Sequence, residues 1–334
     1  MVAVSSVCFS ALRGQDKAKM LVRRTIAAGR MAHAYIFQGP EGVGKSLFAK
    51  GVAAAVNCHD KSRIEACGDC VSCRKFRSGN HPDLTVVRPE KGAVKIDQVR
   101  RMSRELTYPP YESETRVVIL EDVHTMRREA ANSLLKTLEE PPVDNILILT
   151  SESSHGILAT LTSRCQILPF FPLSIDDTVA ILVDRDVDAD KARILAHLSE
   201  GSPGRALLLE KKDLLSLWKE VVEVVSDPDI DPSRDVDIIL QLGEKMGALK
   251  ENLQLFLGML QIWLRDLLLG DGDFFPSAGG RRVKKWDSGQ ILSRLRAVES
   301  AGRELDRNCN KNLVCEVLLF RLQSIAAGEC NCTP

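Results

Sequence analysis

The sequence predicts an α/β domain with a parallel sheet, followed by all-α domains. In the first half of the 334 residues, short continuous apolar runs alternate with helical segments. Such runs are typical of strands buried on both faces of a parallel sheet. After residue 174 no further strand pattern follows, and the rest of the chain reads mainly as helices. The chain is also longer than one ordinary hydrophobic core requires, which favours two or three domains.

The strands and helices of the first half follow from local patterns. Short apolar runs predict strands at 33–39, 82–89, 115–122, 145–151 and 167–174. Helical spacing of apolar residues predicts helices at 45–57, 96–107 and 128–140. The last of these helices stops at Pro141–Pro142 because proline cannot continue a helix.

The second half divides into two helical groups. Residues 175–208 read as a small group and residues 209–330 as a longer one. Segment 252–270 is apolar on most sides, so we expect it to be buried, while 270–289 is irregular. The predicted domains are an α/β domain (1–170), a small helical domain (171–208) and a helical C-terminal domain (209–334).

Composition limits the class of protein. The chain is 44% apolar and 27% charged, with a formal net charge of +0. Zero net charge excludes a uniformly basic nucleic-acid binder but permits local basic patches. The sequence contains no run of about 18 uncharged apolar residues, so no membrane span is predicted. The first residues lack the pattern of an export signal, so we expect a cytoplasmic protein.

The stretch "GPEGVGKS" (39–46) has the pattern of a phosphate-binding loop. Backbone N–H groups at Gly39, Gly42 and Gly44 can surround phosphate oxygens, while Lys45 reaches the terminal phosphates and Ser46 binds Mg²⁺. A chance glycine-rich turn is the alternative. The strand before the loop and the helix after it favour an ATP/Mg²⁺ site.

Four cysteines within sixteen residues predict a metal site. Cys58, Cys67, Cys70 and Cys73 have the spacing C-x8-C-x2-C-x2-C, which suits one tetrahedral Zn²⁺ with a closed ligand shell. Such a site is structural, because it folds a short excursion (58–73) that has little core of its own. A redox pair or unconnected thiols are the alternatives, and His59 competes as a ligand.

Several motifs resemble a known family. They are "GRMAHAYIFQGPEGVGKS" (29–46), "SGNHPDLTVV" (78–87), "VKIDQVRRMSREL" (94–106), "AANSLLKTLEEPP" (130–142), "LTSRCQILPFFPLS" (161–174) and "GSPGRALLL" (201–209). Together with the cysteine insertion, they cover roughly residues 10–210. This part of the chain resembles the bacterial clamp-loader ATPases of the AAA+ class, and most closely the delta-prime subunits of DNA polymerase III.

The resemblance implies an architecture and partners. The small helical domain is then the lid of an AAA+ domain, and the C-terminal domain is an oligomerisation collar. The implied partners are gamma/tau and delta subunits in a five-membered ring, a sliding clamp and primed DNA, within the DNA-directed DNA polymerase holoenzyme. The Ser-Arg-Cys motif implies that Arg164 reaches the nucleotide of a neighbouring subunit, although a surface ion pair is the simpler interpretation.

Two departures from the family pattern bear on hydrolysis. Hydrolytic members have Asp then Glu at the strand end, whereas this chain has Glu121 then Asp122. Glu121 can still reach Mg²⁺, but the shorter Asp122 would orient water poorly. In "GSPGRAL", Gly204 stands where motor subunits have an Arg, and Arg205 follows one step around the helix. We therefore expect ATP binding with weak or absent hydrolysis.

Other features leave alternatives open. The hydroxyls of Thr150–Ser151 suit a polar sensor of nucleotide, or simple capping of the strand end. Residues 61–104 hold eleven Lys/Arg against five Asp/Glu, and 279–286 form a basic segment; both are DNA-contact candidates or solvated surfaces. Alternative functions are a gamma/tau-type motor ATPase, a small-molecule phosphotransferase and a zinc-stabilised interaction module.

Overall fold

The structure is a computed structural model that describes residues 7–152, 156–270, 286–307 and 309–324. The chain forms two compact units. The first comprises 1–189 and 200–205, and the second comprises 190–199 and 206–334. The three-domain division expected from the sequence stays a prediction, and the two units are described separately below.

The first unit is built on a five-stranded sheet with the order β2-β3-β4-β1-β5. The strands are β1 (Ala34–Gln38), β2 (Leu84–Val87), β3 (Arg116–Leu120), β4 (Asn145–Ser151) and β5 (Gln166–Pro169). Every neighbouring pair is parallel. The predicted parallel sheet is therefore confirmed, and each predicted strand segment contains or overlaps an observed strand.

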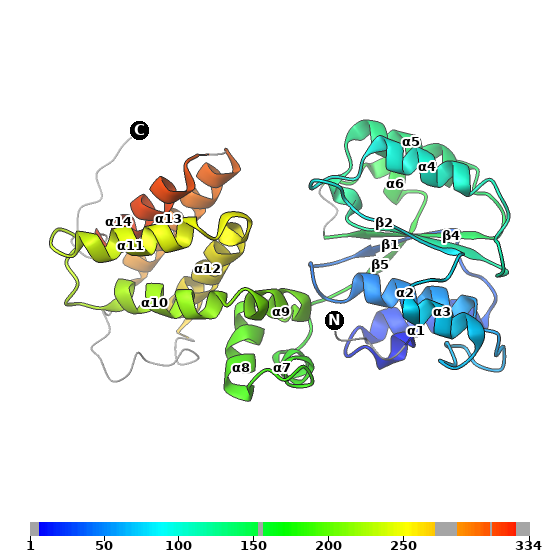
Figure 1. Cartoon of the computed structure of the whole chain (residues 1–334), viewed down its shortest axis with the longest axis horizontal. Coiled ribbons are helices and arrows are strands. Elements are labelled where there is room, and N and C mark those ends of the chain that lie inside the picture. Colours follow the sequence, from blue (N-terminus) through cyan, green and yellow to red (C-terminus); the bar gives the residue numbers. More distant parts are fainter. Residues whose placement is uncertain (1–6, 153–155, 271–285, 308, 325–334) are drawn as a thin grey trace. The chain divides into compact units, whose positions relative to one another are not determined.

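Alternating side chains place a core on each face of the sheet. In β3, Val117 and Ile119 enter one core, and Val118 and Leu120 enter the other. Figure 1 shows α1, α2 and α3 on one face and α4, α5 and α6 on the other. Burial on both faces explains why the strands read as continuous apolar runs. The helices are α1 (Asp16–Ala27), α2 (Lys45–Val56), α3 (Val71–Ser78), α4 (Ile96–Glu105), α5 (Arg128–Glu139), α6 (Ala159–Thr162) and α7 (Ile175–Val183).

The strand register brings three carboxyl ends to one edge of the sheet. Gln38 at the end of β1 pairs with Ser151 at the end of β4. Leu120 at the end of β3 pairs with Leu149 in β4. The loops that follow these strands therefore meet at this edge, where ligands usually bind in open parallel sheets.

The second unit is helical within the described residues. Its helices are α8 (Ala189–Leu198), most of α9 (Pro203–Lys211), α10 (Leu214–Ser226), α11 (Val236–Gly247), α12 (Leu253–Leu269), α13 (Ser288–Asp306) and α14 (Lys311–Ser324). Phe256, Leu260 and Trp263 of α12 are buried, which confirms the predicted burial of this helix. Residues 271–285 of the predicted irregular segment lie outside the described residues, as do Cys330 and Cys332.

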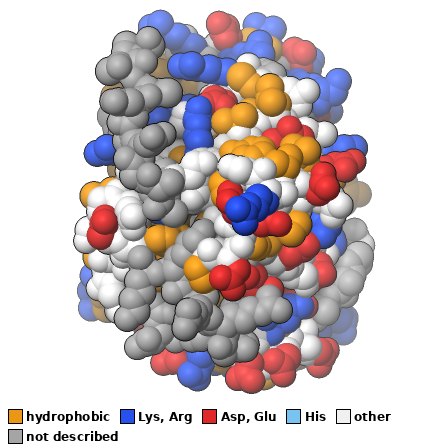
Figure 2. Space-filling model, turned by 90° about the vertical axis from the view of Figure 1, so that its left-hand side faces the viewer, with side chains coloured by type: hydrophobic (Ala, Val, Ile, Leu, Met, Phe, Trp, Pro, Cys, Tyr) orange, Lys and Arg blue, Asp and Glu red, His pale blue; other side chains and the backbone are white. Residues whose placement is uncertain are grey.

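Exposed apolar side chains occur on the helices of the second unit. In the view of Figure 2, hydrophobic side chains lie exposed between Lys, Arg, Asp and Glu side chains. The large exposed apolar residues described in this unit are Leu208, Ile238, Leu240, Leu269, Leu292 and Leu313. Across the described ranges, no helix has both the length and the apolar character needed to cross a membrane.

Candidate functional site

The phosphate loop, residues 39–46, connects the end of β1 to the start of α2. Gly42 and Gly44 have φ angles of 76° and 98°, in the left-handed region that glycine adopts without steric penalty. Among the described residues, none accepts a hydrogen bond from the backbone N–H groups of Gly42, Val43 or Gly44. Unpaired N–H groups before the first turn of a helix suit phosphate oxygens.

Lys45 lies inside this loop. The residue is only 7% exposed, and its Nζ donates hydrogen bonds to the carbonyl oxygens of Gly39 at 2.6 Å and Pro40 at 2.7 Å. Burial lowers the pKa of Lys45, and the nearby carboxylate of Asp122 opposes that shift. The ammonium group is thus positioned to exchange two carbonyl oxygens for phosphate oxygens.

Ser46 and Glu121, the two predicted Mg²⁺ ligands, lie together. The Ser46 hydroxyl donates to Glu121 Oε1 at 2.5 Å. The other carboxylate oxygen, Oε2, accepts a hydrogen bond from Arg88 Nε at 3.1 Å. A hydroxyl and a carboxylate at hydrogen-bond distance are a suitable oxygen pair for Mg²⁺. The Arg88 guanidinium, however, already supplies one positive charge to this carboxylate.

Asp122 has a different environment from Glu121. Its φ angle of 54° is left-handed, so the chain turns sharply immediately after β3. Its N–H donates to Thr150 Oγ1 at 3.1 Å, and its carbonyl accepts hydrogen bonds from Thr125. Burial raises the pKa of the Asp122 carboxyl, although His124 and Lys45 lower it. The turn therefore fixes the backbone of Asp122, and Thr150 is engaged by that turn.

The turn before and into α9 packs directly on the phosphate loop. The N–H of Gly204 donates to the Gly42 carbonyl at 2.9 Å, and Ser202 Oγ donates to the Glu41 carbonyl at 2.7 Å. A Cβ atom on Gly204 would lie 2.7 Å from the Cα of Gly42. The two backbones thus approach as closely as glycine permits. Arg205 Nε is buried and has no hydrogen-bond partner among the described residues.

Arg164 contacts neither the phosphate loop nor the acidic pair. It lies between α6 and β5, and its Nη2 forms an ion pair with Glu139 Oε1 at 2.7 Å. Its Nη1 donates to the Thr160 carbonyl at 3.0 Å and to Ser163 Oγ at 3.3 Å. The side chain is 35% exposed, so its guanidinium is accessible to another molecule.

The four predicted zinc ligands form one cluster. The sulfur atoms of Cys58, Cys67, Cys70 and Cys73 all lie within 4.8 Å of one another. The Cys73–Cys58 and Cys67–Cys73 sulfur distances are 3.7 and 3.9 Å. Four sulfurs bound to a tetrahedral zinc ion at about 2.3 Å lie about 3.8 Å apart. The cluster therefore fits Zn²⁺, and His59 is not part of it.

The burial of the cluster and the pKa values of its thiols also suit a metal site in this excursion. Cys58 and Cys73 are buried and belong to the core on the α1–α3 face. Cys70 and Asp69 N–H groups lower the pKa of Cys67 to about 6, whereas burial raises the pKa of Cys73. The cluster is thus anchored in the core and combines thiols of contrasting acidity.

The excursion is also fixed to the N-terminal segment. Glu65 forms an ion pair with Arg23 at 2.7 Å, and the Ala66 carbonyl accepts a hydrogen bond from Cys8 Sγ at 2.8 Å. These contacts hold the middle of the excursion against α1 and the segment before it.

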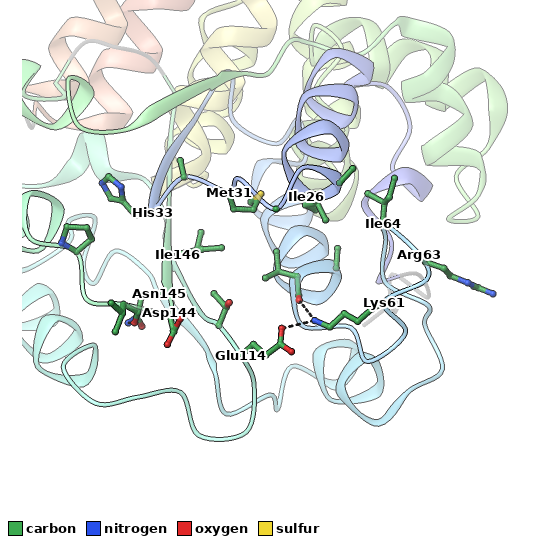
Figure 3. Close-up of a pocket in the computed structure, with 18 of the residues that line it drawn as sticks. Ile26, Met31, His33, Lys61, Arg63, Ile64, Glu114, Asp144, Asn145 and Ile146 are labelled. Carbon is green, nitrogen blue, oxygen red and sulfur yellow. Dashed lines mark hydrogen bonds and ion pairs between the residues drawn. The ribbon is translucent and has the colours of Figure 1, made fainter.

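A cavity of about 770 Å³ lies at the opposite edge of the sheet, near the starts of β1 and β4. Figure 3 shows Lys61 and Glu114 paired in it, with His33 and Asn145 on another side. The Lys61–Glu114 distance is 2.9 Å. None of the predicted nucleotide or metal residues lines this cavity, so its volume does not mark the candidate site.

Comparison with known proteins identifies the family. A family model described as "DNA polymerase III, delta subunit" matches residues 14–174. The DNA polymerase III subunit delta' of Bacillus subtilis (strain 168) is 35% identical over 318 residues, which are 92% of this chain and 96% of that protein. The chain belongs to the DNA polymerase III subunit delta' family. The predicted resemblance to delta-prime subunits is thereby confirmed.

The tau subunit is less similar than this delta' relative. The tau subunit of Bacillus subtilis (strain 168) is 28% identical over 270 residues, which are 79% of this chain and 44% of tau. The chain thus spans less than half of that protein. The delta' assignment therefore takes precedence over the gamma/tau alternative.

Among solved structures, a gamma subunit-related protein of Thermotoga maritima has a TM-score of 0.50 with this chain at 16% identity, covering 92% of this chain and 99% of that one. At this identity the likeness concerns the fold alone. It agrees with the predicted α/β domain followed by helices, and the delta' family member thus shares its fold with a gamma-related protein.

Sequence reasoning missed two contributors to the site of this delta' family member. Arg88 follows β2 directly, and the sheet order places β2 beside β3, whose end carries Glu121. The available signal was a cation near the end of the predicted strand 82–89, because parallel strands end at one edge of the sheet. Gln15 donates to the Phe171 carbonyl at 2.6 Å and to the Val43 carbonyl at 3.5 Å; no local pattern indicates that contact.

Proposed function

We propose that this delta' family member is an ATP-binding subunit of a bacterial clamp loader, which helps to open the sliding clamp and load it on primed DNA. The observation that carries ATP binding is the phosphate loop, with unpaired N–H groups beside the buried ammonium of Lys45. Membership of the family supplies the polymerase context. That task on bacterial DNA places the protein in the cytoplasm.

The acidic pair supports binding of nucleotide with little hydrolysis. Glu121 faces Ser46 and would hold Mg²⁺ with it, while Arg88 neutralises part of its charge. Asp122 follows in a left-handed turn. It is shorter than the Glu that hydrolytic family members use at this position to orient water. Misplacement by about 1 Å can lower a rate roughly a hundredfold. ATP turnover by the isolated chain is therefore slow or absent.

Arg164 acts on a neighbouring subunit in this proposal. Its contacts with Glu139, Thr160 and Ser163 keep it away from its own phosphate loop. A guanidinium that is accessible at the surface can stabilise charge on a phosphoryl group held by another chain. The ion pair with Glu139 then holds Arg164 in position until the neighbour binds.

The remaining parts have supporting roles. The cysteine cluster binds structural Zn²⁺, and the exposed leucines of the second unit belong to an interface with gamma/tau and delta subunits in a ring of five.

A hollow between α4 and α5 has four cationic side chains and one acidic one; its charged residues are Arg100, Arg101, Arg104, Lys136 and Asp97. We assign this hollow to the phosphates of primed DNA.

The deciding experiment measures ATP binding and turnover with the purified chain. We expect saturable ATP binding that Lys45→Ala weakens roughly a hundredfold, because buried charge-assisted hydrogen bonds are lost. Lys211→Ala, an equal change of charge in the second unit, is the control. Exchange of the acids in the double variant Glu121→Asp/Asp122→Glu should raise turnover. Absence of ATP binding, or brisk turnover by the unaltered chain, would refute the proposal.

A further inference from the structure

A second cavity, of about 460 Å³, lies beside α2 and is lined by no residue of the phosphate loop. It is bounded by α2, the end of α3, β2 and the N-terminal segment; α2 and α3 cover the same face of the sheet (Figure 1). We call it the basic pocket. Its volume falls in the range of small-molecule sites, about 300–1,000 Å³.

The basic pocket combines apolar walls with three positively charged side chains. Leu47, Phe76 and Val86 contribute apolar surface, and Lys50, Arg77 and Arg88 contribute three positive charges. No Asp or Glu is among its described lining residues. Three like charges around one cavity repel one another, so the arrangement favours an anion between them.

The protein leaves most of this positive charge unneutralised. Arg88 uses its Nε for Glu121, and Arg77 uses one Nη for the Gly68 carbonyl. No described residue accepts a hydrogen bond from Lys50 or forms an ion pair with it. The remaining guanidinium N–H groups and the ammonium group are therefore donors without an acceptor among the described residues.

The chemistry of the walls and the cations together selects the ligand. Arginine binds phosphate through paired N–H groups, and lysine adds a mobile point charge. An inorganic anion alone would leave the apolar walls without a partner. We propose that the basic pocket binds a small organic phosphate, in which a compact aromatic or apolar body carries the phosphate group. This site is separate from the phosphate loop and does not depend on the proposed function.

The test uses phenyl phosphate, which joins an aromatic ring to one phosphate group. Binding is measured by calorimetric titration of the full chain carrying Lys45→Ala, so that the phosphate loop does not contribute. We expect saturable binding that is about tenfold tighter than that of inorganic phosphate, because the ring contacts the apolar walls. Adding Lys50→Gln and Arg77→Gln should weaken it by about tenfold or more.

Arg74→Gln is the matched control. Arg74 lies on α3 with Arg77 but does not line the pocket, so its loss should change affinity less than about twofold. Because Arg77 also contacts Gly68, the single variant Lys50→Gln is measured too, with thermal unfolding as a check of folding. Equal affinity for inorganic phosphate, equal effects of Lys50→Gln and Arg74→Gln, or no saturable binding would each overturn the proposal.

Discussion

At the scale of single residues, Asp83 organises a loop through its buried carboxylate. Its Oδ1 accepts the N–H of Tyr111 at 2.5 Å, and its Oδ2 accepts those of Glu112 and Ser113, both at 2.9 Å. Burial acts to raise the pKa of Asp83, but these N–H groups and the Arg116 guanidinium hold it below its ordinary value. The ionised form therefore stabilises the folded chain.

Replacing Asp83 by Asn should destabilise the protein in a pH-dependent way. The amide leaves N–H groups of the loop without an acceptor, so the free energy of unfolding at pH 7 should fall by about 2–3 kcal/mol. The folded-state pKa lies below the unfolded value of about 3.9, so the contribution is complete above that pH and declines as pH falls through the folded pKa. Denaturant unfolding at several pH values measures both effects.

The exposed Asp186 provides a control for this change. Asp186→Asn should alter the free energy of unfolding by less than about 0.5 kcal/mol. A difference between Asp83→Asn and the unaltered chain that grows on acidification would contradict the assigned sign.

Individual residues also show what sequence can and cannot predict. Lys45 and Ser46 belong to one contiguous motif whose spacing dictates their task, so both could be named from the sequence. Arg88 could not, because its partner Glu121 is distant in the chain and becomes its neighbour only through the order of the strands. Motifs predict local chemistry, whereas contacts between strand ends require the topology.

At the scale of elements, the strands were predictable because both faces of the sheet are covered. α3 was not predicted, although its first turn lies within the cysteine excursion and carries Cys73. Its apolar periodicity is short, and the spacing of cysteines rather than a hydrophobic stripe sets its place. The excursion thus depends on metal ligands where other elements depend on core packing.

Removal of the metal should therefore destabilise the cysteine excursion and α3. Chelation, or Cys73→Ser, should abolish bound zinc and lower the thermal unfolding temperature, because folding of the excursion is coupled to metal binding. Metal content by atomic emission and unfolding by circular dichroism measure the two effects. Cys309→Ser changes an exposed cysteine outside the cluster and should leave both values unchanged. Full stability after complete zinc removal would contradict a structural site.

If the hollow between α4 and α5 binds DNA phosphates, its cations should contribute to the salt dependence of DNA affinity. If Arg101 and Lys136 each contact a DNA phosphate, the double variant Arg101→Gln/Lys136→Gln should lower the slope of log affinity against log salt by about 1.4–1.8. The measurement is DNA binding by the assembled loader over a salt series. The variant Arg193→Gln/Lys211→Gln removes the same charge from the second unit and serves as comparison. Identical slopes for both double variants would exclude the assignment.

At the scale of the whole molecule, the two units carry different functional features. The phosphate loop, acidic pair, cysteine cluster and Arg164 all belong to the first unit. The second unit carries exposed leucines, and within its described part neither a nucleotide motif nor a metal cluster is present. The end of the strand patterns before residue 175 indicated where the α/β part of the chain stops, but apolar periodicity alone could not assign partners to the helices that follow.

Donation of Arg164 should appear only in the assembled complex. With gamma/tau and delta subunits present, Arg164→Ala should lower ATP turnover by about a thousandfold at the site it contacts, as loss of such an arginine does in related chemistry. Glu139→Ala breaks the same ion pair but keeps the guanidinium, so turnover should change little. Equal losses in the two variants would indicate that the ion pair, and not the arginine, matters.

Gly42 and Gly204 impose a reciprocal constraint on replacement. Each occupies the space where the other would place a methyl group, so a side chain at either position must push the two backbones apart. Their effects on this contact should consequently be non-additive: once Gly204→Ala has pushed the backbones apart, Gly42→Ala adds little further clash with Gly204, although it still strains the left-handed backbone of residue 42. Each glycine therefore limits the range of residues that the other position can accept, and position 42 is restricted further by its own backbone conformation.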